Sequence, residues 1–125
     1  MKRILYIEDN KLQIATFLFA ARGKYDVRSE TQGACTLQRI ALDSPDIVVI
    51  DWELSISQVD PDPKNHDGIV IGKAVRRAYP DLPIVVLTDW PREDVEEHIN
   101  GEFTYVSKRK EWEEVFKEIA QILGE

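Results

Sequence analysis

Short apolar runs alternate with segments of helical periodicity along the chain. Residues 3–7, 46–51 and 83–88 are rich in β-branched side chains, and these runs are continuous rather than alternating with polar residues. Such runs are typical of strands buried on both faces of a parallel sheet. Residues 25–30 and 103–107 are more polar but also favour strands. The intervening segments 11–22, 34–42, 69–79, 91–99 and 111–123 carry apolar residues at helical spacing.

Helix-ending and helix-starting residues agree with these boundaries. Asn10 is a candidate N-cap for the first helix, and Gly23 supplies a C-terminal stop. Pro45 and Pro80 follow the second and third helices, and Pro91 occupies the first position of the fourth. Strands that alternate with helices predict an α/β domain in which helices cover both faces of a parallel sheet.

Polar side chains follow four of the predicted strands. Glu8 and Asp9 come after the first, Asp51 ends the third, Thr88 ends the fourth, and Lys108 follows the fifth. Each has an ordinary explanation taken alone, since acids often cap helices and lysines are usually solvated. In open parallel sheets, however, binding sites lie at the carboxyl ends of the strands. The convergence of these side chains therefore predicts a site at that edge.

The residue types at this edge suit phosphoryl chemistry. Three carboxylates held close together repel one another unless a cation relieves them, and Mg²⁺ prefers oxygen ligands. Lys108 offers a positive charge for a phosphoryl oxygen, and Thr88 offers a hydroxyl donor. A carboxylate such as Asp51 can then attack a phosphoryl donor and form an aspartyl phosphate.

Composition narrows the classes of function. The length of 125 residues suits one domain, and the net charge of −7 argues against a nucleic-acid surface, which needs a basic patch. The only cysteine, Cys35, can form no internal disulfide, which fits a reducing, cytoplasmic setting. The first apolar run is too short for a signal peptide or a membrane span.

Five motifs, in this order, resemble the receiver domain of bacterial two-component response regulators: "ILYIEDN", "DIVVIDWEL", "DG", "PIVVLT" and "YVSK". The resemblance covers essentially the whole chain and implies a CheY-like, flavodoxin-like (βα)5 fold with strand order 2-1-3-4-5. It implies a single receiver domain over residues 1–125 with no output domain. It also implies a signalling protein that catalyses at most its own phosphotransfer and dephosphorylation.

The resemblance assigns a role to each matched position. Asp51 matches the phosphoacceptor, which receives its phosphoryl group from a sensor histidine kinase or a phosphotransfer protein. Glu8 and Asp9 match the acidic pair that holds Mg²⁺ together with Asp51, and the backbone carbonyl of Glu53 matches the remaining protein ligand.

The matched switch residues are Thr88 and Tyr105, and Lys108 is matched as a catalytic residue beside Asp51 and Thr88. Thr88 and Lys108 match the groups that contact the phosphoryl group, and Tyr105 matches the aromatic that turns inward when the hydroxyl engages it. In the family, the fourth helix, fifth strand and fifth helix then present an altered surface to a downstream protein or to a second copy. Here that surface would lie near residues 90–97, 103–106 and 111–115, and it involves no nucleic acid and no membrane.

The sequence departs from the family pattern in four places. The stretch between Asp51 and Gly68 is longer than usual, and a solvated surface loop or a lid over the site would both explain it. Asp89 replaces a small residue, and it either repels a phosphoryl group or points to solvent. Arg109 replaces a proline, which favours a trans bond and a displaced Lys108. Glu8 replaces the more common aspartate.

Two alternatives to a phosphorylated receiver domain are open. A pseudo-receiver would keep the fold as a phosphorylation-independent interaction module, which Asp89 and Arg109 favour. A phosphatase of the haloacid dehalogenase class also uses an aspartyl phosphate, and "DWELS" faintly resembles its D-x-D-x-T motif. That motif normally follows the first strand, whereas Asp51 follows the third, and Glu53 replaces its second aspartate.

Overall fold

Five parallel strands form the centre of the computed structural model, which describes residues 1–52, 67–99 and 101–125. The strands are β1 (Arg3–Ile7), β2 (Asp26–Glu30), β3 (Ile47–Asp51), β4 (Ile84–Thr88) and β5 (Thr104–Ser107). They pair in the order β2-β1-β3-β4-β5. The predicted strand order is therefore confirmed.

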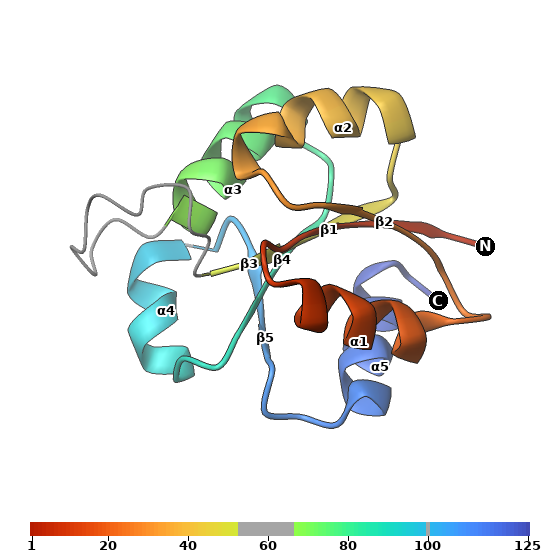
Figure 1. Cartoon of the computed structure of the whole chain (residues 1–125). Coiled ribbons are helices and arrows are strands. Elements are labelled where there is room, and N and C mark those ends of the chain that lie inside the picture. Colours follow the sequence, from red (N-terminus) through yellow and green to blue (C-terminus); the bar gives the residue numbers. More distant parts are fainter. Residues whose placement is uncertain (53–66, 100) are drawn as a thin grey trace.

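Helices cover both faces of this sheet, as the alternation of elements predicts. The helices are α1 (Lys11–Ala21), α2 (Thr36–Asp43), α3 (Asp67–Ala78), α4 (Arg92–Ile99) and α5 (Trp112–Ile122). Helices α1 and α5 pack on one face, and α2 and α3 lie on the other (Figure 1). Apolar residues of α4 join the core on the α2–α3 side.

The two faces have separate cores because side chains alternate along each strand. Leu5, Val48 and Val86 point to the α2–α3 side, whereas Tyr6 and Val49 point to the α1–α5 side. Every residue of β3 and β4 is buried, which explains why their sequences read as continuous apolar runs.

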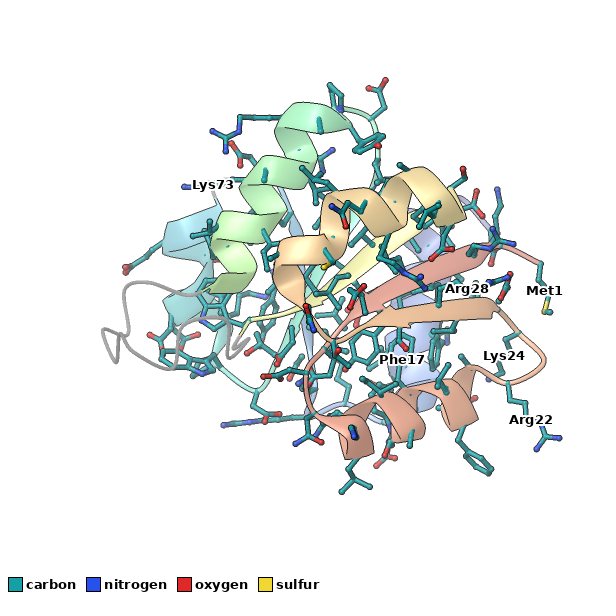
Figure 2. The ribbon with its side chains drawn as sticks, turned by 45° about the horizontal axis from the view of Figure 1, so that its top comes forward. Met1, Phe17, Arg22, Lys24, Arg28 and Lys73 are labelled. Atoms are coloured by element: carbon teal, nitrogen blue, oxygen red, sulfur yellow. The ribbon has the colours of Figure 1, made fainter. Side chains whose placement is uncertain are left out.

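The α1–α5 side is rich in aromatic rings. Phe17 of α1 is fully buried, and its ring stacks on Tyr6 with a centroid distance of 4.1 Å. Phe116 of α5 lies 5.1 Å from the same ring, so Phe17 links both helices to the sheet (Figure 2). Such rings contribute large buried apolar areas and fix how the helices sit on the strands.

Helix α1 starts directly at the edge that carries the predicted site. The Asn10 side chain caps it by accepting hydrogen bonds from the backbone N–H groups of Leu12 and Gln13. Asn10 is thus the residue that caps the helix, and Asp9 precedes it at the sheet edge. In the described part of the chain, no helix is long and apolar enough to cross a membrane.

Strand order reverses between β1 and β3, because β2 and β3 flank β1 on opposite sides. The connections that leave these strands therefore diverge to opposite faces of the sheet, and a crevice opens at the carboxyl ends. Glu8, Asp9 and Asp51 stand at this point.

Candidate functional site

The acids of β1 and β3 form a compact cluster at the reversal point. Ile7 pairs with Ile50, so Glu8 and Asp51 come to lie at neighbouring positions of the sheet edge. Glu8, Asp9 and Asp51 each offer one carboxylate oxygen, and these three atoms lie within 4.8 Å of one another. Glu8 is 2% exposed and Asp51 is 6% exposed. The structure therefore brings together the three acids that the sequence predicted.

Lys108 joins this cluster from the opposite half of the sheet. Its Nζ atom lies 3.0 Å from Asp51 Oδ1 and 3.8 Å from Glu8 Oε2, and its side chain is only 11% exposed. The backbone N–H of Lys108 donates to the carbonyl oxygen of Thr88, which fixes the end of β5 beside the end of β4. The backbone of Lys108 is thus fixed beside β4, and its side chain extends from there to Asp51.

Burial and charge act strongly on Glu8. Burial, and then a hydrogen bond and repulsion from the nearby Asp51 carboxyl, together raise the pKa of the Glu8 carboxyl to about 8. The Lys108 ammonium and the Asn10 N–H lower the Glu8 pKa, but they do not compensate. One Glu8 oxygen, Oε2, is buried with no hydrogen-bond partner among the described residues.

Tyr6 adds a second buried polar atom on the same side of the sheet. Its hydroxyl has no hydrogen-bond partner within the described ranges. Burial raises the Tyr6 pKa, and the charges of Glu8 and Asp51 raise it further, so the phenol lies within the field of the acid cluster. The site is therefore polar and largely buried, and among the described residues its three carboxylates face the single ammonium group of Lys108.

These features fit a divalent hard cation. Mg²⁺ binds oxygen ligands from a few carboxylates and completes its octahedral shell with water or phosphate oxygens. The three clustered acids supply such ligands, and a cation would also satisfy the buried Glu8 oxygen. Glu53, whose carbonyl the sequence also proposed as a ligand, lies outside the described residues.

A hydrogen-bonded connection runs from Thr88 to Tyr105 through the backbone of Trp90. The buried Thr88 hydroxyl accepts a hydrogen bond of 3.1 Å from the Trp90 N–H. The Tyr105 hydroxyl donates a hydrogen bond of 2.7 Å to the Trp90 carbonyl oxygen. The structure thus links the two predicted switch residues, although they lie on different strands.

The structure shows the consequences of two departures from the family pattern, those at Arg109 and Asp89. The Lys108–Arg109 bond is trans, as expected without a proline. The expected displacement of Lys108 is wrong, because its ammonium group reaches Asp51 and the Lys108 N–H still pairs with β4. Asp89 is exposed, in agreement with the interpretation that it points to solvent. The extra loop, residues 55–66, lies outside the described residues.

Two contributors to the site were not predicted. At Gly68 in α3, an added Cβ would collide with the Asp51 carbonyl oxygen and lie 3.0 Å from that of Trp52. The "DG" motif carried a signal for this glycine, but its reason is a close approach that only the fold reveals. The Trp90 backbone left no signal in the sequence, because any residue has the same N–H and C=O groups.

Comparisons with known proteins concern the fold. No protein-family model matches the chain, and no curated protein matches its sequence. The chemotaxis protein CheY4 of Vibrio cholerae has a similar structure, with a TM-score of 0.81 and 18% identity over 98% of each chain. A two-component response regulator from Clostridium difficile gives a TM-score of 0.80 at 18% identity, covering 99% of this chain and 97% of that one.

A third similar structure is the signal receiver domain of an HD domain-containing protein from Pseudomonas fluorescens Pf-5. It gives a TM-score of 0.79 at 19% identity and covers 98% of this chain and 87% of that one. The chain therefore has the flavodoxin-like fold of response-regulator receiver domains, which confirms the predicted fold class.

Proposed function

We propose that this chain is a receiver domain of two-component signalling that accepts a phosphoryl group on Asp51 and signals through protein contacts. The observation that carries the proposal is the position of Lys108, whose ammonium group lies 3.0 Å from Asp51 Oδ1 inside a buried acid cluster. At this end of the sheet, a lysine beside clustered acids can bind a negatively charged group that enters from solution and can stabilise its charge.

Asp51 is the proposed nucleophile. One of its carboxylate oxygens forms a bond to phosphorus while the nitrogen–phosphorus bond of a phosphohistidine breaks, and that electron pair returns to the imidazole of the donor. The donor is a sensor histidine kinase or a phosphotransfer protein. Lys108 neutralises charge on the phosphoryl oxygens during transfer, and its own pairing with Asp51 holds the carboxylate in place.

Glu8, Asp9 and Asp51 are the proposed Mg²⁺ ligands, and the metal would neutralise charge on the transferring group. Thr88 is the proposed phosphoryl sensor. Since its oxygen accepts from the Trp90 N–H, its own O–H is left to donate to a phosphoryl oxygen. Movement of Thr88 would then pass to Tyr105 through the Trp90 backbone.

The proposed output surface comprises α4, β5 and α5, where a downstream protein or a second copy would bind. Tyr105 lies on β5 between the two helices and packs partly against the core on the α4 side. A charge change at Asp51 would bias a two-state element here, which is how local modification usually reaches a distant surface. The strongly acidic charge of −7 fits protein partners better than nucleic acid.

The test is to incubate the protein with Mg²⁺ and a small phosphodonor and to measure its intact mass. We expect one added phosphoryl mass, which disappears in Asp51→Asn. The mass should persist in the matched control Asp81→Asn, because Asp81 is an exposed acid in the turn before β4. If folded wild-type protein gains no mass, the pseudo-receiver alternative is correct and the proposal is wrong. An adduct that survives in Asp51→Asn would assign the acceptor to another residue.

A further inference from the structure

Arg92 lies directly against the proposed switch residue. The centre of its guanidinium group is 5.0 Å from the centroid of the Tyr105 ring, which is the geometry of a cation–π interaction. Arg92 is the first residue of α4, and Tyr105 is in the middle of β5. The contact therefore joins two elements of the proposed output surface through a single pair of side chains.

The orientation of both partners is fixed by further contacts. Arg92 Nη1 lies 3.1 Å from Glu96 Oε1, one helical turn along α4, which directs the guanidinium group along the helix. The Tyr105 hydroxyl is held by the Trp90 carbonyl oxygen at 2.7 Å. The ring thus has a hydrogen bond at its tip and a cation over its face, and both partners come from the segment that follows β4.

We propose that Arg92 is a positioning residue that acts through Tyr105 and sets how strongly Tyr105 favours its inward position. This inference rests on the proposed function and concerns the regulation of the same site. We take the observed position of Tyr105 as the inward one, and it combines the Trp90 hydrogen bond with the Arg92 stack. A ring that turned away from Trp90 would lose this hydrogen bond. Without Arg92, the inward position depends more on the phosphoryl group and on Thr88.

The expected size of the effect follows from the exposure of the pair. The Arg92 side chain is 57% exposed, and a cation–π contact at such a site changes an equilibrium between two positions by roughly two- to five-fold. The effect is large enough to measure and too small to unfold the protein.

The experiment uses ¹⁹F NMR of the full chain labelled with 3-fluorotyrosine. The chain has four tyrosines, and Tyr105→Phe assigns the Tyr105 signal. We expect Arg92→Met to move this signal toward the outward position by the two- to five-fold change in population, whereas Arg92→Lys gives a smaller change. Mg²⁺ with a phosphodonor should bring the Arg92→Met signal back toward that of the wild type.

Two controls separate positioning from general effects. Arg77→Met removes the same charge from an exposed position of α3, and we expect it to leave the Tyr105 signal unchanged. The Tyr25 and Tyr79 signals should stay constant in all variants. An unchanged Tyr105 signal in Arg92→Met would overturn the inference, as would an equal change in Arg77→Met. The first measurement needs no phosphoryl transfer, so its outcome is distinct from that of the mass experiment.

Discussion

Burial and the charge of Asp51 act in the same direction on the pKa of Glu8, and the charge of Lys108 opposes them. Its carboxyl is buried beside Asp51, and this environment raises its pKa to about 8 from an ordinary value of 4.5. Between these two values, the unfolded chain has lost the Glu8 proton while the folded protein keeps it. The folded state then binds more protons, so the free energy of unfolding falls as pH rises through this window.

We therefore expect metal-free protein to lose stability between about pH 4.5 and pH 8, with a contribution from Glu8 of at most about 1.4 kcal/mol per pH unit. Urea unfolding in the presence of a chelator, at several pH values, measures this slope. Glu8→Gln should flatten it, because glutamine does not titrate, whereas Glu113→Gln on the exposed side of α5 should not. Equal slopes in wild type and Glu8→Gln would show that Glu8 ionises normally.

At the scale of the element, the start of α3 depends on the absence of a side chain at Gly68. A Cβ there would meet the Asp51 carbonyl oxygen and two backbone atoms of Trp52, at 3.0 and 3.1 Å. Backbone atoms at a strand end cannot move aside without shifting Asp51 itself. Helix α3 is therefore placed against the site by the smallest residue available.

We expect Gly68→Ala to destabilise the protein by roughly 1–3 kcal/mol of overpacking, partly offset by about 1 kcal/mol of improved helix propensity. It should also slow phosphorylation, because the end of β3 shifts. Lys73→Ala, on the exposed face of the same helix (Figure 2), serves as the control and should change the free energy of unfolding by less than about 0.5 kcal/mol. Increased stability in Gly68→Ala would mean that the contact relaxes at no cost.

Some elements could be predicted from the sequence, whereas the position of Lys108 could not. The strands β3 and β4 were predictable because full burial produces continuous apolar runs, and α1 was predictable because Asn10 and Gly23 mark its ends. Lys108 was expected to be displaced because the usual proline is missing. The pairing of its N–H with the Thr88 carbonyl holds it in place instead, and backbone pairing leaves no mark on residue type.

At the scale of the whole molecule, the site exists only because of the topology. Glu8, Asp51 and Lys108 are far apart in the sequence, and the parallel order of the strands brings their carboxyl ends to one edge. The sequence predicted this convergence from the strand ends alone. Contacts between side chains of different elements, such as Arg92 with Tyr105, depend on distances that no periodicity encodes.

Because the acids of the proposed metal site come from β1 and β3, a bound cation should stabilise the global fold rather than one local segment. A ligand that binds only the folded state adds about 1.4 kcal/mol for each tenfold increase in concentration above its dissociation constant. We therefore expect Mg²⁺ to raise the urea midpoint of the wild type, and more so above pH 8, where Glu8 has lost its proton and attracts the cation. Asp9→Asn should weaken the effect, and Asp81→Asn should preserve it. Equal stabilisation of wild type and Asp9→Asn would place the bound cation away from the acid cluster.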